Sequence, residues 1–137
     1  MSEASFAWPA RVYWEDTDAG GVVYHAQYLA FMERARSEWM RALGFGQDAL
    51  RESHGVCFVV RAMNIDFRAP ARLDDSLAVS VRLAQCRGAS LLFTQEVRRD
   101  GELLVAAEVR AAAVCTERFR PIPIPAALLA RLKHELH

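Results

Sequence analysis

Residues 15–25 read EDTDAGGVVYH, and the interpretation of the whole chain depends on this stretch. It joins an apolar, aromatic-rich run, residues 6–14, to a helical pattern that starts near Ala26. Two carboxylates, two glycines and a histidine therefore lie in the connection that enters a helix. A helix N-terminus has unpaired N–H groups and a partial positive charge, so it stabilises a group that becomes negative during a reaction. The plain alternative is that Asp16 and Asp18 cap the helix while the glycines form a turn.

The pattern that follows predicts one long helix over Ala26–Leu43. Apolar side chains recur there at steps of three and four residues, as on one face of a helix: Tyr28, Met32, Ala35, Trp39 and Leu43. Gly44 is placed to end this helix in a left-handed conformation. A shorter helix is expected over Gln47–Glu52.

Most of the remaining chain predicts strands. Residues 6–15 are expected to form a first strand with Pro9 near its start or at a sheet edge. Four more strands are expected over residues 56–67, 77–86, 90–99 and 102–116, and Asp100-Gly101 predicts a hairpin between the last two. A short helix over Ala126–Leu136 ends the chain. This order predicts an α+β fold in which an antiparallel sheet packs against one dominant helix.

Composition limits the classes of protein that fit. The chain has 137 residues, of which 53% are hydrophobic, so a single globular domain over residues 1–137 is expected. Lys+Arg and Asp+Glu both total 17, which gives a formal net charge of +0. Such a balance does not favour nucleic acid or an acidic membrane as the main partner. A net charge near zero is also compatible with a stable oligomer.

The cysteines and the N-terminus indicate a reduced, cytoplasmic protein. The three cysteines form no CxxC pair, and neither they nor the histidines have metal-ligand spacing, so no metal site is expected. The N-terminal segment has no basic region before its apolar residues, and Pro9 interrupts it, so it does not look like a secretory signal. No apolar run approaches the ~20 residues of a transmembrane helix.

Residues 11–39, RVYWEDTDAGGVVYHAQYLAFMERARSEW, closely resemble the hotdog-fold thioesterases, and among them the YbgC type of the 4-hydroxybenzoyl-CoA thioesterase family. The strand pattern extends this resemblance over nearly the whole chain. The resemblance implies a long central helix wrapped by a curved antiparallel sheet. It implies hydrolysis of an acyl thioester of coenzyme A (CoA), or of a related acyl carrier, with no cofactor because CoA is part of the substrate. It also implies a homodimer joined sheet to sheet, commonly paired again into a homotetramer, with active sites at the subunit interface.

The resemblance assigns two catalytic groups to this sequence. The catalytic carboxylate of the family falls on Asp18, and the N–H group that polarises the thioester carbonyl falls on the backbone of His25. Asp18 then acts either as the nucleophile or as a general base toward water. The side chain of His25 either binds substrate, orients Asp18 or packs.

Five further residues are expected to contact the substrate. Gly20 and Gly21 let the chain turn close to a ligand, since neither has a side chain. Tyr24 belongs to the family motif, and Gln27 stands where YbgC-type members usually have Asn. Gln27 keeps the amide but adds a methylene, which shifts any hydrogen bond from this position. Arg87, in a predicted turn before Gly88, is the first candidate for the CoA phosphates, followed by Arg118 and Arg120.

Rival interpretations concern both residues and function. Asp16 is expected to have a turn or capping role rather than a role in the chemistry. Glu33 is the rival catalytic acid, because another branch of hotdog thioesterases uses a carboxylate on the long helix, although pairing with Arg36 or packing at the dimer seam is the favoured explanation. Two alternative functions are a hotdog hydratase or dehydratase, for which His25 is an argument, and a non-catalytic acyl-CoA-binding protein.

Overall fold

The computed structural model describes residues 6–136. Within this range the chain forms five strands, three α-helices and one short 3-10 helix. The strands are β1 (Phe6–Arg11), β2 (Val56–Phe67), β3 (Ser76–Arg87), β4 (Ser90–Arg99) and β5 (Glu102–Cys115). The α-helices are α1 (Gln27–Ala42), α2 (Gln47–His54) and α3 (Ala126–Lys133), and the 3-10 helix is Trp14–Asp16.

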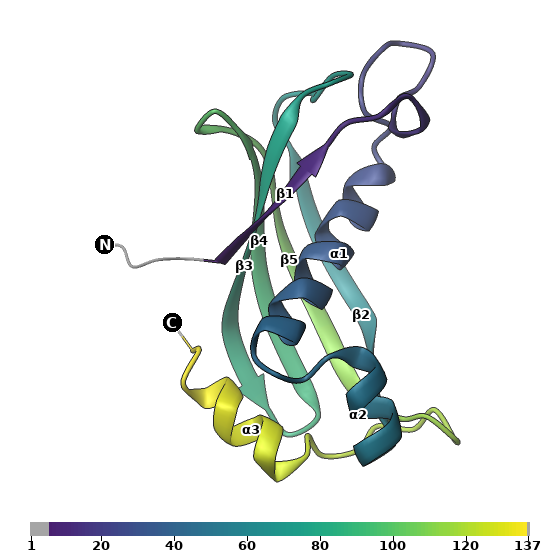
Figure 1. Cartoon of the computed structure of the whole chain (residues 1–137), viewed down its shortest axis with the longest axis vertical. Coiled ribbons are helices and arrows are strands. Elements are labelled where there is room, and N and C mark those ends of the chain that lie inside the picture. Colours follow the sequence, from purple (N-terminus) through teal and green to yellow (C-terminus); the bar gives the residue numbers. More distant parts are fainter. Residues whose placement is uncertain (1–5, 137) are drawn as a thin grey trace.

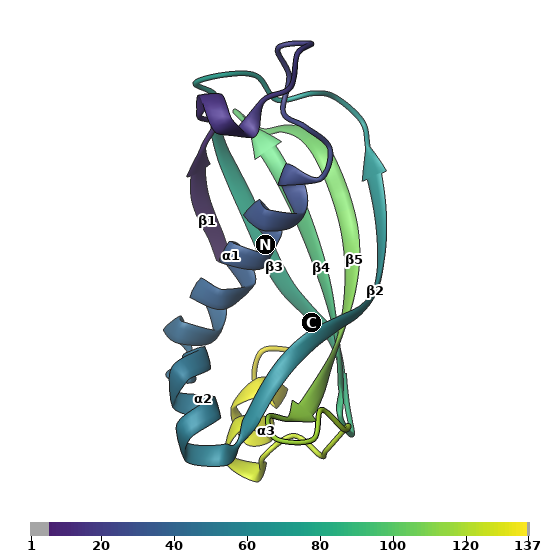
Figure 2. The ribbon, with the colours of Figure 1, turned by 90° about the vertical axis from the view of Figure 1, so that its right-hand side faces the viewer.

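The strands form one antiparallel sheet in the order β1-β3-β4-β5-β2. Helix α1 lies across one face of this sheet (Figure 1), and the side view shows the sheet curving around it (Figure 2). The expected α+β fold, with a long helix wrapped by a curved antiparallel sheet, is therefore confirmed. Pro9 lies in the edge strand β1, opposite Ala78, where its missing N–H costs no hydrogen bond on the open side.

The core lies between α1 and the sheet. Four of the five expected residues of the apolar face of α1, Tyr28, Met32, Ala35 and Trp39, are at 4% exposure or less, and Phe31 joins them at 3%. The fifth, Leu43, follows the last helical residue and is only partly buried. The rings of Trp39 and Phe93 meet edge to face at 5.5 Å between centroids, which joins the helix to the middle strand of the sheet. The packing of this face fixes where the N-terminal end of α1 points.

Three expected boundaries differ from the structure by two residues or more, and the others by at most one. The first strand does not reach residue 15, because the chain leaves the sheet after Arg11 and forms the 3-10 helix. Helix α2 runs two residues beyond Glu52, to His54, and Gly55 ends it in the left-handed conformation at φ 63°. Helix α3 ends at Lys133 rather than Leu136. None of the helices in residues 6–136 combines the length and the apolar character needed to span a membrane.

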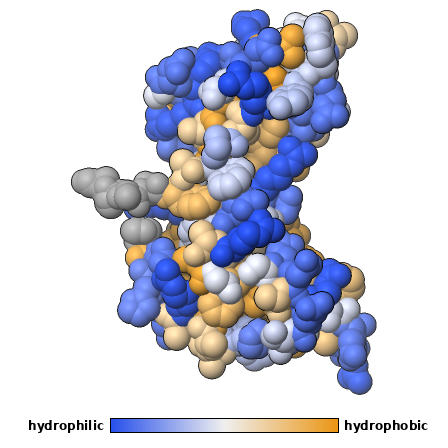
Figure 3. All heavy atoms as spheres, viewed as in Figure 1, coloured by the Kyte–Doolittle hydropathy of each residue, from blue (hydrophilic) through white to orange (hydrophobic). Residues whose placement is uncertain are grey.

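Two loops meet beyond the N-terminal end of α1, namely residues 12–26 and residues 68–75. Their backbones are joined by hydrogen bonds from the Val12 N–H to the Asp75 carbonyl at 3.0 Å and from the Val23 N–H to the Ala71 carbonyl at 2.9 Å. Hydrophilic side chains cover most of this end of the molecule in the space-filling view (Figure 3). The predicted catalytic residues lie on the first of these loops.

Candidate active site

Asp18 opens a tight turn over residues 18–21, called the candidate turn below, that presents its carboxylate at the surface. The Gly21 N–H donates to the Asp18 carbonyl at 3.0 Å, and the Gly20 N–H donates to Asp18 Oδ1 at 2.8 Å. Gly21 has φ +81°, a conformation that strains other residues. A Cβ at Gly20 would lie only 3.2 Å from Asp18 Oδ1. The two glycines therefore shape the turn and leave room for the carboxylate.

Asp16 has the opposite environment, although it lies only two residues earlier. Its side chain is buried, and its two oxygens accept hydrogen bonds from the Tyr13 N–H and from Gln27 Nε2, both at 2.8 Å. Its carbonyl accepts the Tyr24 N–H at 2.9 Å. The expected turn role of Asp16 is confirmed. The amide nitrogen of Gln27, expected to contact substrate, is committed to Asp16 in this structure.

The N-terminal end of α1 is uncapped by any side chain within the described residues. The alternative that Asp16 and Asp18 cap this helix is therefore wrong, because neither carboxylate accepts a backbone N–H of α1: Asp18 bonds the Gly20 N–H, and Asp16 bonds the Tyr13 N–H and the Gln27 side chain. Over residues 6–136, the N–H groups of His25 and Ala26 have no hydrogen-bond partner. Such N–H groups, with the partial positive charge of the helix behind them, are ready to bind an oxygen that becomes negative.

Aromatic rings cluster around the N-terminal end of α1. The ring of His25 lies 4.6 Å from that of Tyr24 and 6.3 Å from that of Phe67, measured between centroids. Tyr28 lies 5.8 Å from Phe67, and its hydroxyl accepts the Ala71 N–H at 3.0 Å. Burial raises the pKa of Tyr28, so its hydroxyl keeps its proton as a potential donor.

A cavity of about 260 Å³ opens beside this aromatic group. Its walls come from three segments: Val23, Tyr28 and residues 67–70. Residues 67–70 are not among those that the sequence predicts to be functional. The available signal was the Ala69-Pro70 step directly after a strand, which predicts a turn but not that the turn faces the end of another loop.

Within one chain, Arg87 does not lie near the N-terminal end of α1 or the candidate turn. It ends β3, whereas the opposite end of β3, at Ser76, pairs with Arg11 next to the candidate turn. A strand of 12 residues spans roughly 36 Å, so the two ends of β3 are well separated. Arg68 lines the cavity and bonds Asp66 at 2.8 Å. The exposed Arg72 pairs with Val22 in an isolated antiparallel bridge, one residue before the cavity-lining Val23.

Glu33, the rival catalytic acid, lies on the exposed side of α1, six residues after the helix begins at Gln27. Its Oε2 accepts the Ser37 hydroxyl at 2.7 Å, and it borders a groove of about 130 Å³ that Arg36 also lines. The expected pairing of Glu33 with Arg36 is wrong in this structure, because Arg36 Nη1 donates to the buried amide of Gln95 at 2.8 Å instead. Burial lowers the pKa of Arg36, and the charge of Glu33 opposes this effect.

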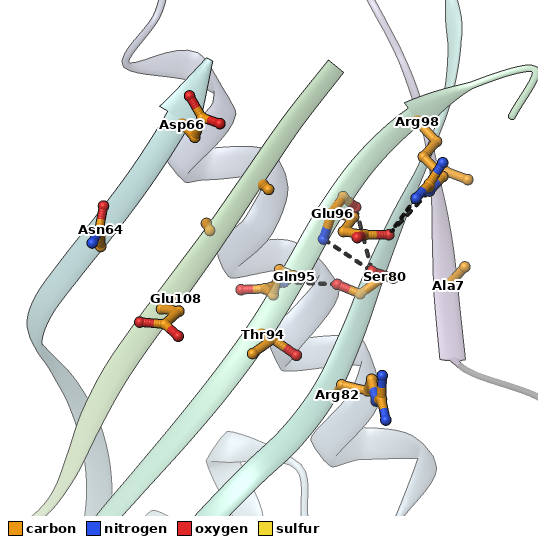
Figure 4. Close-up of a pocket in the computed structure, with 13 residues that line it drawn as sticks. Ala7, Asn64, Asp66, Ser80, Arg82, Thr94, Gln95, Glu96, Arg98 and Glu108 are labelled. Atoms are coloured by element: carbon orange, nitrogen blue, oxygen red, sulfur yellow. Dashed lines mark hydrogen bonds and ion pairs between the residues drawn. The ribbon is translucent and has the colours of Figure 1, made fainter. Parts of the chain in front are cut away.

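A larger hollow, of about 590 Å³, lies on the face of the sheet turned away from α1 (Figure 4). Polar side chains line it, and two of them, Arg98 and Glu96, form an ion pair at 3.0 Å. None of the predicted site residues lines this hollow. In the described part of the chain, no three His, Cys, Asp or Glu side chains group so as to hold a metal ion.

Residues 12–132 match the family model of the thioesterase-like superfamily, and the chain belongs to this superfamily. The acyl-CoA thioester hydrolase YbgC of Escherichia coli O157:H7 is 48% identical over 97% of this chain and 99% of that protein. The acyl-CoA thioesterase YbgC of Haemophilus influenzae is 43% identical over 98% of both chains. A crystal structure of a probable thioesterase from Bartonella henselae aligns with a TM-score of 0.85 and 40% identity, covering 89% of this chain and 100% of that one. The resemblance to the YbgC-type thioesterases is thus confirmed.

Proposed function

We propose that this chain hydrolyses the thioester bond of an acyl-CoA, consuming water and releasing a free acid and the CoA thiol. The observation that carries the proposal is the pair of unpartnered N–H groups at His25 and Ala26, on the same loop as the exposed carboxylate of Asp18. The names of the YbgC relatives, which match over nearly the full chain, support the same reaction.

The His25 N–H polarises the thioester carbonyl in this proposal. Attack on the carbonyl carbon places negative charge on its oxygen, and a fixed N–H donor stabilises that charge without reorganising. Loss of one such donor typically costs about 100- to 1,000-fold in rate. Because this donor belongs to the backbone, the contribution does not depend on the imidazole side chain.

Asp18 supplies the second catalytic group. It either attacks the carbonyl carbon, forming a mixed anhydride and expelling the CoA thiolate, or takes a proton from an attacking water. The Gly20 N–H holds one carboxylate oxygen, Oδ1, while the carboxylate stays exposed. Hydrolysis by these two groups requires no metal or redox cofactor.

Of the remaining predicted substrate contacts, some come from the same chain as Asp18 and one requires a second copy of the chain. Gly20 and Gly21 lie on the candidate turn and Tyr24 follows it on the same loop, so we infer that they contact substrate directly. Gln27 acts through Asp16, which its side chain holds. Arg87 reaches the CoA phosphates only if a second copy of the chain brings it to the site.

We therefore propose a homodimer or homotetramer with active sites shared between copies. Support comes from β2, an edge strand of 12 residues on which Val60 and Phe67 are about half exposed. A long edge strand with exposed apolar side chains favours pairing with another chain. Light scattering tests this state, and an active particle of 15.4 kDa would contradict it.

The activity is tested with a panel of acyl-CoA substrates that differ in chain length and ring content, read by the release of free thiol. Thiol release from at least one substrate, in proportion to enzyme, is the expected result. A second reading, by mass spectrometry of the acyl product, distinguishes hydrolysis from hydration of an enoyl-CoA. Binding of acyl-CoA without release of thiol would contradict the proposal.

A further inference from the structure

Loop 68–75 connects β2 to β3 and holds the candidate turn through its backbone. The Ala71 carbonyl accepts the Val23 N–H at 2.9 Å, and the Ala71 N–H donates to the Tyr28 hydroxyl at 3.0 Å. Val23 lies two residues before His25, whose N–H is proposed to polarise the substrate. The position of that N–H therefore depends on where loop 68–75 holds the backbone of Val23.

The guanidinium of Arg99, at the end of β4, fixes loop 68–75 at two points. Its Nη1 donates to Asp75 Oδ2 at 2.7 Å and to the Pro70 carbonyl at 3.3 Å. Its Nη2 donates to Glu102 Oε1 at 2.8 Å. Asp75 Oδ2 also accepts the Arg72 N–H at 2.8 Å. One side chain thus ties both ends of the segment that contains Ala71 to the sheet.

The ion pair between Arg99 and Asp75 is more shielded from water than the neighbouring pair on the other face of β4. The side chains of Arg99 and Asp75 are 24% and 22% exposed, against 42% and 43% for Arg98 and Glu96. Burial alone would raise the pKa of Asp75, but the Arg72 N–H and the Arg99 guanidinium together hold it below its ordinary value. Charge-assisted hydrogen bonds of this kind are stronger than those between neutral groups.

We propose that Arg99 is a positioning residue for the hydrolysis: it holds loop 68–75, and this loop sets the position of the His25 N–H. The inference rests on the proposed function, because it concerns the placement of the proposed donor. Arg99 touches no reacting atom in this account. Its effect passes through the Pro70–Ala71 backbone to Val23. A displacement of about 1 Å in a catalytic group costs up to about 100-fold in rate.

The test compares Arg99→Met with a matched control, Arg98→Met. Both substitutions remove one guanidinium from adjacent positions of β4. Arg98 lines the outer hollow (Figure 4), where its side chain bonds Glu96 and the Gly101 carbonyl. Neither of these partners belongs to loop 68–75. Two quantities are measured well below the melting temperature of each variant: the kinetics of thiol release, and hydrogen exchange of the backbone over residues 16–28.

The expected result for Arg99→Met is a kcat lower by about 10- to 100-fold, with KM for acyl-CoA within roughly threefold of wild type. Exchange over residues 16–28 becomes faster, while exchange in β3 and β5 stays unchanged. Arg98→Met keeps kcat within roughly twofold and leaves exchange unchanged. Arg99→Lys gives an intermediate kcat, because one ammonium group cannot bond Asp75, Pro70 and Glu102 together.

Two results would overturn the positioning role. One is an active wild type in which Arg99→Met retains kcat within roughly twofold. The other is unchanged exchange over residues 16–28 in Arg99→Met, or equal acceleration over the whole chain, which would mark general destabilisation. The exchange measurement needs no activity. A wild type that releases no thiol would therefore contradict the proposed function, while exchange still decides whether Arg99 holds the loop.

Discussion

The two ends of the molecule are stabilised in different ways. At the end that carries the candidate turn, polar groups hold the loops: Asp16 bonds Gln27, and Arg99 bonds Asp75. At the opposite end, where β3 turns into β4, helix α3 closes the core with apolar side chains, among them the fully buried Leu128 and Leu132. Directed hydrogen bonds thus add to buried apolar surface at the first end, whereas apolar burial by α3 closes the other.

This difference follows from what each end has to do. An apolar end lowers its free energy by excluding water, and exact backbone positions matter little there. The end with the candidate turn must present the His25 N–H and the Asp18 carboxylate to solvent and still hold them in place. Hydrogen bonds from buried or half-buried polar groups provide such positions, because they are directional. The predictions below test whether this polar end carries the activity and whether its hydrogen bonds stabilise the fold.

The largest effect is expected from Asp18→Asn, which removes the proposed catalytic charge. The asparagine oxygen can still accept the Gly20 N–H, so the turn is retained while kcat falls by at least about 100-fold. Asp48→Asn, an exposed carboxylate in the first turn of α2, is the matched control and should stay within roughly twofold. Thiol release measures both, and circular dichroism checks folding. If Asp18→Asn keeps near-wild-type turnover, Glu33→Gln is the next variant to test.

A smaller effect, on stability, is expected from Gln27→Ala. This change leaves one oxygen of the buried Asp16 carboxylate without its donor, so the free energy of unfolding falls by about 1–2 kcal/mol. Gln47→Ala removes a comparable bond at the surface, to the Ser37 hydroxyl at 2.9 Å, and should cost less than about 0.5 kcal/mol. Urea unfolding measures both values. Equal losses in the two variants would contradict a structural role for the bond between Gln27 and Asp16.

Asp75→Asn tests the second polar contact through its dependence on pH. The folded-state pKa of Asp75 is lowered, so its charge stabilises the fold above 3.8, the ordinary aspartate value, and this stabilisation is lost as the pH falls through the lower folded-state pKa. At pH 7 the free energy of unfolding of wild type should exceed that of the variant by about 1 kcal/mol, a modest value because the ion pair is partly exposed. The difference should shrink below pH 3.8. A difference independent of pH would show that the charge of Asp75 is not its cause.

The smallest effect is expected from removal of metal ions. The proposed reaction uses a carboxylate, a backbone N–H and water, so prolonged chelation followed by buffer exchange should leave kcat unchanged. Recovery of a lost activity by added zinc or magnesium would contradict the mechanism.

The sequence predicted the long helix and the order of helices and strands along the chain because both depend on periodic apolar residues, such as those of α1. It also separated the roles of Asp16 and Asp18 correctly in one respect, since Asp16 serves a turn. The sequence could not place Arg87 relative to the candidate turn. That placement depends on the pairing of β1 with β3, which puts Ser76 beside Arg11 and Arg87 at the opposite end of β3.

The contacts that hold the polar end were also outside the reach of the sequence. Arg99 and Asp75 are 24 positions apart, and Tyr28 and Ala71 are 43 apart. No periodicity joins such pairs, and each residue alone has the pattern of an ordinary strand end, loop or helix position. Only the packing of α1 on the sheet brings them together.

The most direct test of the account compares kcat for His25→Ala and Asp18→Asn in the same assay. The central claim is that the backbone N–H of His25, not its imidazole, polarises the thioester carbonyl, so the alanine variant keeps the donor. His25→Ala is therefore expected to lose at most about 10- to 100-fold, clearly less than Asp18→Asn. A loss in His25→Ala as large as that in Asp18→Asn would contradict the claim and assign the chemistry to the imidazole.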